Sequence, residues 1–357
     1  MSRDRNAGWI GRVVFLFFAL LLANVILAFV LLTNNNPHGN WDAWAIWNMH
    51  ARFLYRGGSH WTALFSPELA YSHPDYPLLL PGLVAGGWFF LGSEHWLVPA
   101  AIAFFFEIAV VGLLVSAVGF VRGTVQALLA GCVLLATSAF ILQGPMQYAD
   151  IPLAFFYLAA LAALILHDSR EDNSVFLLAL SGLAAGLGLS TKNEGWAFAA
   201  ALFFTRILFR KETIPWLIGL LFPALITLYF KVRLAPSNDL LSAATPAHLW
   251  QCAMDISRYR QIVATLFQDT IYPGAVFSAP VLIIYFLLVG KNSLDRKNSG
   301  AVTPLWGALG LTLTAYLISF LFTPYPLAWH LSTSLDRLLM QLWPSVLLLY
   351  FITVERP

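Results

Sequence analysis

Apolar stretches of about twenty residues recur along the whole 357-residue chain, and they limit what it can fold into. A stretch of about this length is what an α-helix needs to cross the bilayer core. Only 11% of the residues are charged, against roughly 25% in a soluble domain. The chain is therefore predicted to be all-α, a polytopic transmembrane helix bundle forming a single domain over residues 1–357. About ten spans are expected, near residues 12–32, 96–119, 124–143, 151–167, 175–190, 196–209, 214–230, 272–290, 303–322 and 337–353.

Basic residues set the expected orientation. Arg3, Arg5 and Arg12 precede the first apolar run. That run is too long for a signal peptide and has no A-x-A cleavage pattern after it, so it is interpreted as an uncleaved first span. Lys and Arg are denser in the short segments on the side of the N-terminus, which predicts that both termini are cytoplasmic. Lys and Arg form no basic stripe of the kind that binds nucleic acid.

Two large loops are then expected on the outer face, at 33–95 and 231–271. In the first loop, residues 41–56 have helical spacing and predict a helix lying flat on the membrane, with its tryptophans on the apolar face. Residues 76–92 are apolar but interrupted by Pro and Gly. They are interpreted as a re-entrant or interfacial helix, because a full span would invert the charge bias of every later segment.

Asp42 is the first candidate for chemistry. It lies among Trp41, Trp44 and Trp47, directly after the first span. Tryptophan prefers the membrane–water boundary, where a carboxylate can meet both a lipid-borne and a water-side reagent. The alternative is an acidic residue that merely complements the dipole in the first turn of a helix.

Further carboxylates are expected at the same membrane level. In His73-Pro74-Asp75-Tyr76-Pro77, two prolines hold His73 and Asp75 in a rigid turn; the alternative is a simple stop before the next apolar helix. Asp150 opens a span on the outer face, which is also an ordinary N-terminal helix signal.

Two basic residues are candidates for an anionic ligand. Lys192 and Glu194 lie in a short turn between apolar helices, either as a ligand-binding pair or as simple solvation of the turn. His330 and Arg337 precede the last span, where Ser334 is expected to cap the helix. Arg337 would then lie in the first turn, where the dipole disfavours a cation. This placement favours an anionic ligand there, with a pair to Asp336 or another carboxylate as the alternative.

Three other residues, one glutamate and two cysteines, have no assigned role. Glu107 lies in the middle of a span, where a charge costs about 2.5–3.5 kcal/mol, so it is expected to be protonated or paired, with no role assigned. Cys132 and Cys252 have no metal-ligand spacing and predict neither a disulfide nor a metal site.

Together these residues resemble the GT-C superfamily of polytopic glycosyltransferases, which includes protein O-mannosyltransferases and lipid A aminoarabinose transferases. Asp42 matches the family's essential Asp near the start of the first outer loop. His73-Pro74-Asp75 resembles its His-Pro-Pro turn, with Asp75 in place of the second proline. Asp150 matches an Asp that opens a later span. Arg337 with Pro344 matches a basic residue followed by proline in the last outer helix.

The resemblance implies transfer of a sugar from a polyprenyl-phosphate donor to a hydroxyl of a lipid, glycan or protein acceptor, at the outer face of a bacterial inner membrane. Asp42 would be the general base, and a single displacement would invert the anomeric centre. No cofactor is required, although a divalent metal at Asp42 or Asp75 is compatible with the scheme. The expected catalytic residues are Asp42, Asp150 and Glu194, and the expected substrate-binding residues are His73, Asp75, Lys192, His330, Arg337 and Trp44.

Two other classes are alternatives. A transporter or lipid flippase needs ionisable groups or broken helices near the bilayer midplane, whereas only Glu107 is expected there, which disfavours transport. A non-catalytic assembly or scaffold protein is the other alternative, and it predicts that replacing Asp42 would change no activity.

Overall fold

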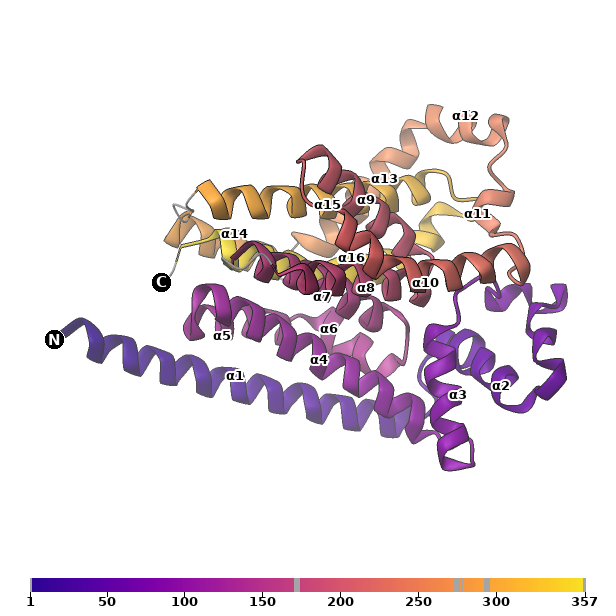
Figure 1. Cartoon of the computed structure of the whole chain (residues 1–357), viewed down its shortest axis with the longest axis horizontal. Helices are drawn as coiled ribbons and strands as arrows, with labels where there is room; N and C mark the ends of the chain where they lie inside the picture. Colours follow the sequence, from indigo (N-terminus) through magenta and orange to yellow (C-terminus); the bar gives the residue numbers. More distant parts are fainter. Residues whose placement is uncertain (1, 170–173, 273–276, 278, 292–295, 356–357) are drawn as a thin grey trace.

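The computed structural model describes residues 2–169, 174–272, 277, 279–291 and 296–355. Within these ranges the chain is helical, with no strand, as expected for an all-α membrane bundle. Its two termini lie at one end of the bundle, and α2, α3 and α11 lie at the other (Figure 1). The multi-pass membrane architecture expected from the sequence is thus confirmed.

In the described part of the chain, six helices are long and apolar enough to cross a membrane. They are α1 (Ser2–Asn35), α4 (Leu97–Arg122), α7 (Asp150–Ser169), α10 (Ile214–Arg233), α15 (Arg296–Leu321) and α16 (Leu327–Thr353). A seventh crossing would be a pair bent by 64°, made of α5 (Thr124–Leu135) with α6 (Ser138–Gln143) and the short turn η4 (Gly144–Met146).

The other expected spans are shorter helices: α8 (Val175–Thr191), α9 (Glu194–Leu208) and α14 (Ala279–Val289). The expected span 272–290 also falls partly outside the described residues. The total of ten spans therefore stays a prediction.

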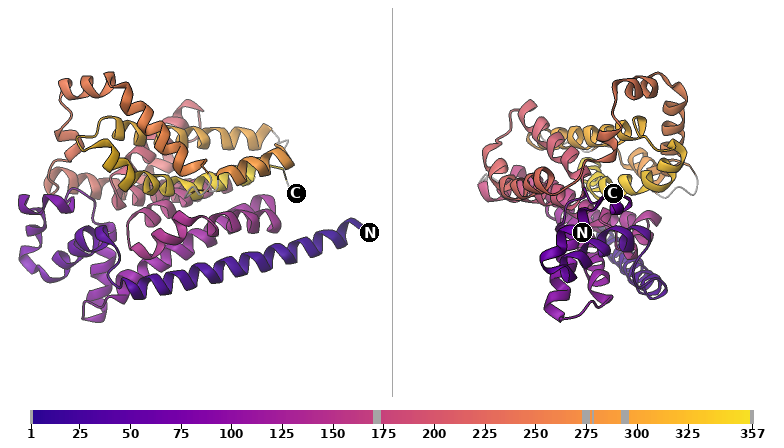
Figure 2. Two further views of the ribbon diagram at one scale, coloured as in Figure 1. Left: turned by 180° about the vertical axis from the view of Figure 1, so that it is seen from behind. Right: turned by 90° about the vertical axis from the view of Figure 1, so that its right-hand side faces the viewer.

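Helices α7 and α16 form the centre of the bundle. In their most apolar 18-residue windows, 83% of α7 and 78% of α16 are buried, against 11% of α1. Helix α1 runs along the outside, beside α4 and α5 (Figures 1 and 2). The rest of the bundle therefore packs around the apolar parts of these two helices.

Helices α8 and α10 pack against each other through glycines. A Cβ atom added to Gly182 would lie 1.8 Å from the backbone oxygen of Trp216, and one added to Gly219 would lie 1.9 Å from that of Ala179. Small residues allow membrane helices to approach this closely. The contact fixes the C-terminal end of α10, which carries Lys231, relative to the Lys192 turn that follows α8.

The loop over 33–95, called the first outer loop after the side on which it is expected, is folded as a series of short helices: η1 (Ala43–Trp47), α2 (Asn48–Arg56), η2 (Gly58–Phe65), η3 (Pro67–Ser72) and α3 (Leu79–Leu91). The expected helix over 41–56 is present, but residues 43–47 are π-helical. A π-turn contains more residues than an α-turn, so the tryptophan spacing no longer keeps one face. Trp47 is fully buried while Trp41 and Trp44 are exposed. The expectation that all three share one membrane-facing stripe is wrong.

Helix α3 lies across the direction of the long helices (Figures 1 and 2). Its 13 residues would extend only about 20 Å, less than the roughly 30 Å of the hydrocarbon core. This length agrees with the predicted re-entrant or interfacial helix and disfavours a full span.

The second outer loop is also helical, with α11 (Asp239–Ser242), α12 (Pro246–Met254) and α13 (Ile256–Thr270). Arg258 fastens it to the bundle by donating to the backbone oxygens of Leu321, at 2.8 Å, and Phe320, at 3.1 Å. These carbonyls lie at the C-terminal end of α15, where backbone oxygens have few partners within the helix; that of Phe320 also accepts from the Thr323 N–H at 3.3 Å. The bond fixes the segment that leads from α15 into α16.

Candidate active site

A cleft of about 1290 Å³ opens where the first outer loop meets the ends of α9, α10 and α16. Its walls come from residues far apart in the sequence. The polar side chains that line it include Asp42, His73, Tyr76, Lys192, Glu194, Lys231, Tyr325, His330, Asp336 and Arg337. Most residues singled out in the sequence are therefore brought to one cavity.

Asp150 is the centre of an ion network at one end of the cleft. It is the first residue of α7 and is fully buried. Its carboxylate accepts hydrogen bonds from Lys192 Nζ at 2.9 Å, Gln341 Nε2 at 2.6 Å and Arg337 Nε at 3.0 Å. A buried carboxylate needs such partners to offset its lost hydration. Asp150 therefore acts as a shared anion that holds two cations in place.

Arg337 joins Asp150 to Asp42. Its Nη2 is 2.7 Å from Asp42 Oδ2 and 3.0 Å from Asp150 Oδ2. The guanidinium lies over the ring of Tyr148, 4.5 Å from the centroid, and the Tyr148 hydroxyl accepts from the backbone N–H of Asp42 at 3.3 Å. A planar guanidinium can direct separate N–H donors to two carboxylates while its face stacks on an aromatic ring, a geometry that a compact ammonium does not offer.

Lys192 is buried, and its Nζ is 2.9 Å from Asp150 and 3.0 Å from Glu194 Oε1. Burial lowers the pKa of the Lys192 ammonium, but the two carboxylates outweigh it and raise the pKa above the usual value. The lysine is therefore charged inside the protein. The alternative that Lys192 and Glu194 merely solvate a turn is wrong.

The network combines three carboxylates, those of Asp42, Asp150 and Glu194, with two cations. Asp150 is enclosed, with 1% of its side chain exposed, whereas 17% of the Asp42 side chain and 19% of that of Glu194 remain exposed. Asp42 and Glu194 both line the cleft, and Asp150 does not. Asp42 can thus meet a substrate directly, while Asp150 acts only through Lys192 and Arg337.

Asp75 forms a second cluster behind the wall of the cleft. It is buried and accepts from Asn193 Nδ2 at 2.7 Å and Asn238 Nδ2 at 2.8 Å, with Lys231 Nζ at 3.7 Å. Lys231 also donates to Asn193 Oδ1 at 2.6 Å. Asp75 is not among the lining residues. It holds lining residues in place, and its expected contact with substrate has no support in this geometry.

The other expected binding residues lie at different depths. His73 lines the cleft and has a left-handed backbone, with φ 49°. His330 also lines it and hydrogen-bonds Thr323 through Nδ1 at 2.8 Å. Trp44 packs edge-to-face on Trp41, with 4.4 Å between the ring centroids. Trp41 lines the cleft, whereas Trp44 does not.

The expected start of the last helix is wrong. Helix α16 begins at Leu327, directly after Pro326, so Ser334 lies inside it and caps nothing. Arg337 lies ten residues beyond Leu327 and not in the first turn. The helix dipole therefore does not disfavour a cation there, and the argument from the dipole for an anionic ligand at Arg337 is wrong. Its ion pairs are with Asp42 and Asp150. A carboxylate pair is thus present, although the partner is not Asp336.

Several residues that shape the site were not predicted from the sequence. Gln341 follows Arg337 by one helical turn, and Tyr148 precedes Asp150 by two residues. Tyr76 stacks on Trp47 with 5.4 Å between centroids, and burial raises the pKa of its hydroxyl well above the usual value. A polar residue at i+4 from Arg337, inside an apolar helix, was the available signal for Gln341.

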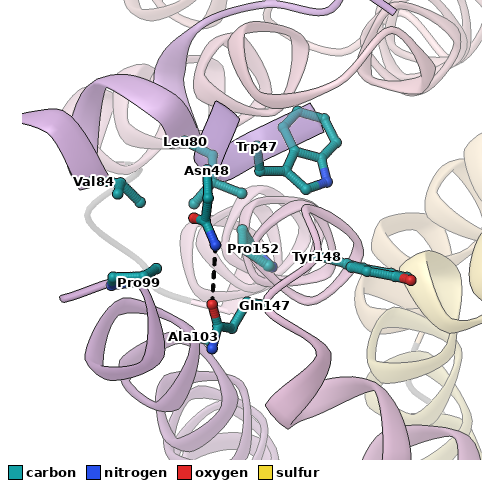
Figure 3. A pocket seen from close by; sticks show the side chains of 9 residues that line it. All are labelled: Trp47, Asn48, Leu80, Val84, Pro99, Ala103, Gln147, Tyr148 and Pro152. Carbon is teal, nitrogen blue, oxygen red and sulfur yellow. Dashed lines mark hydrogen bonds between the residues drawn. The ribbon is translucent and has the colours of Figure 1, made fainter. Parts of the chain in front are cut away.

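The segments next to Asp42 and Asp150 are joined by polar contacts around a second, small cavity (Figure 3). There, a cavity of about 10 Å³ separates the first loop from α4 and α7. Asn48 Nδ2 donates to Gln147 Oε1 at 3.1 Å, the bond drawn in Figure 3. Gln147 Nε2 in turn donates to the backbone oxygen of Pro37 at 3.0 Å. These bonds connect the helix that carries Asp42 to the turn that precedes Asp150.

The fold is similar to solved structures of ArnT from Cupriavidus metallidurans. The structure with bound undecaprenyl phosphate matches with a TM-score of 0.59 and 14% identity, over 94% of this chain and 59% of that one. The apo structure matches with a TM-score of 0.51 and 16% identity, over 98% and 60%. This chain thus spans about three fifths of the length of ArnT. No protein-family model and no curated protein matches it. The chain therefore shares its polytopic helical fold with ArnT, in agreement with the fold that the sequence resemblance implies.

Proposed function

We propose that this protein is a membrane glycosyltransferase that moves a sugar from a polyprenyl-phosphate donor to an acceptor hydroxyl. The observation that carries the proposal is the Asp42–Arg337–Asp150–Lys192 network beside a large cleft. The fold shared with ArnT, of which one structure holds undecaprenyl phosphate, supports the same substrate class. Such a donor has its phosphate at headgroup depth and its chain in the bilayer.

The reaction we infer is a single displacement. The acceptor oxygen attacks the anomeric carbon while the bond from that carbon to the phosphate oxygen breaks, and its electron pair leaves with the phosphate. Asp42 takes the proton from the attacking hydroxyl, a contribution of about 10²–10⁴-fold. One displacement at one carbon inverts its configuration.

Arg337 and Lys192 are suited to the leaving phosphate, which gains negative charge as the bond breaks. Positioned cations in a water-poor site stabilise developing charge without reorganising. Asp150 holds both cations, and Glu194 further orients Lys192. Among the proposed catalytic groups, Asp42 is thus the base, while Asp150 and Glu194 act on the two cations. His73 and His330 would contact the sugar or the acceptor from the cleft walls.

We further infer that the cleft faces the outer side of a bacterial inner membrane, with both termini cytoplasmic. The termini lie at the end of the bundle opposite the first outer loop, which agrees with this orientation (Figure 1). The direct test of function is transfer of sugar from labelled polyprenyl-phosphate donors by the purified protein in nanodiscs. Absence of transfer and of undecaprenyl phosphate binding by a folded protein would refute the proposal.

A further inference from the structure

A buried chain of polar side chains continues from Asp150 into the apolar bundle. Gln341 Nε2 donates to Asp150 Oδ1 at 2.6 Å, and the Tyr316 hydroxyl donates to Gln341 Oε1 at 2.7 Å. The Tyr316 and Tyr157 hydroxyl oxygens are 3.1 Å apart. Tyr157 and Gln341 are fully buried and Tyr316 is 3% exposed. The chain links α7, α15 and α16, three helices of the bundle.

The direction of every hydrogen bond in this chain follows from one charge. Asp150 lies between two cations and is ionised, so it can only accept. Gln341 must therefore turn its NH₂ group towards Asp150 and its carbonyl oxygen towards Tyr316. Tyr316 then uses its single proton on Gln341, so Tyr157 must donate to the Tyr316 oxygen. The result is a chain of hydrogen-bond donors, here called the relay, that runs from Tyr157 through Tyr316 and Gln341 and ends on the Asp150 carboxylate.

The relay also connects the helices that carry the ion network. Tyr157 follows Asp150 by seven residues on α7, so both lie on one face, about 10 Å apart along the axis. Gln341 follows Arg337 by one turn on α16, again on the same face. Tyr316 on α15 bridges Tyr157 and Gln341. The hydrogen bonds of the relay, together with the backbones of α7 and α16, therefore form a closed ring. This ring fixes α7 relative to α16 next to the ion network.

We propose that Tyr157, Tyr316 and Gln341 are positioning residues for the phosphate-binding cations. Gln341 and Lys192 share Asp150 Oδ1, while Arg337 takes Oδ2. Without the donor from Gln341 the carboxylate can rotate, and both cations then change position. This inference rests on the proposed function in one respect only, that Lys192 and Arg337 bind the donor phosphate.

The test measures binding of undecaprenyl phosphate to the full-length protein in nanodiscs. Tyr316→Phe and Gln341→Met are each expected to weaken binding, by about two- to ten-fold, the range given by the net contribution of one hydrogen bond. Tyr157→Phe should weaken binding in wild type and have no further effect in the Gln341→Met background, because the relay is already cut. Tyr285→Phe is the matched control. Its hydroxyl also donates to a glutamine, Gln126 at 3.2 Å, away from the cleft, and its loss should leave binding unchanged.

Two results would overturn the proposal that the relay positions the two cations. One is Tyr316→Phe binding undecaprenyl phosphate as well as Tyr285→Phe does. The other is additive weakening by Tyr157→Phe and Gln341→Met, which would indicate two independent contacts. If wild type itself binds no undecaprenyl phosphate, the proposed function fails, and the relay is judged by thermal unfolding. The double variant should then lose less stability than the sum of the two single variants, and additivity would refute the relay.

Discussion

Asp42 and Arg337 are 295 positions apart in the chain, yet their side chains form an ion pair of 2.7 Å at the edge of the cleft. The pair joins the first outer loop to the last helix of the bundle. Since Arg337 also holds Asp150, the proposed base is part of the same network as the proposed phosphate-binding cations. A phosphate that draws Arg337 towards itself would loosen its hold on Asp42. Donor binding and release of the base would then be coupled.

Asp42→Asn is expected to leave a folded protein that binds undecaprenyl phosphate but transfers no measurable sugar. The amide keeps the shape of the side chain and cannot accept the proton, so the rate should fall by about 10²–10⁴-fold. Single-turnover transfer and donor binding measured on the same preparation separate the two steps. Glu68→Gln is the control, because Glu68 is an exposed carboxylate of the same loop. Activity within a few-fold of wild type would leave Asp42 as a helix-start residue only.

Removing either cation should reduce both stability and donor binding. Arg337→Ala leaves Asp42 and Asp150 without their shared partner, and Lys192→Ala leaves Asp150 and Glu194 without theirs. Breaking a buried pair in this way costs about 3–5 kcal/mol. Arg337→Lys should still weaken binding, because a lysine ammonium lacks the planar fork of N–H donors with which Arg337 contacts Asp42 and Asp150.

Thermal unfolding and undecaprenyl phosphate binding of the single and double variants test this expectation. The two losses in binding should be non-additive if both cations contact one phosphate. Unchanged binding in variants that remain folded would move the phosphate site elsewhere.

Most of the residues expected from the sequence line the cleft, but their partners were not predicted. Asp42, Asp75 and Asp150 were predicted at one membrane level, because spans of fixed length place their ends in two planes. Which cation meets which carboxylate depends on helix packing, and hydropathy does not encode it. The start of α16 was misplaced because Trp329–Asp336 contains polar residues typical of a loop, although they are helical. The π-turn at Ala43–Trp47 likewise left no periodic signal, and so the burial of Trp47 was missed.

The orientation in the membrane is tested by labelling single cysteines in intact cells, in a background where Cys132 and Cys252 are replaced by Ala. Ser59→Cys, in the first outer loop, is expected to react with a membrane-impermeant maleimide. Glu212→Cys, in the exposed turn between α9 and α10, should react only after the membrane is opened. The reverse pattern would place the cleft on the cytoplasmic side and rule out an outer-face reaction.

The close contact between α8 and α10 predicts opposite effects for two glycine substitutions. Gly182→Ala places a methyl group 1.8 Å from the Trp216 backbone oxygen, and overpacking of this kind costs about 1–3 kcal/mol. Gly112→Ala, in the spanning helix α4, meets no atom within 4 Å and should stabilise by about 0.5–1 kcal/mol, since alanine is the better helix former. The test compares the thermal unfolding of both variants with that of wild type in one detergent. Equal stability of the two would contradict the close approach.

The buried imidazole of His50 is expected to make the stability of the folded protein depend on pH. It is fully buried in α2, with Nε2 3.3 Å from Ser72 Oγ. Burial lowers its pKa from 6.5 to about 4. The unfolded chain therefore binds a proton at a higher pH than the folded protein does, and stability falls as the pH drops from about 6.5 to about 4. A shift of this size corresponds to about 3 kcal/mol.

The comparison that isolates the effect of His50 is between wild type and His50→Gln. The glutamine side chain can still reach Ser72 but does not titrate. Wild type should lose more stability than the variant between pH 7 and pH 4, while parallel curves would mean that the buried imidazole does not set this dependence.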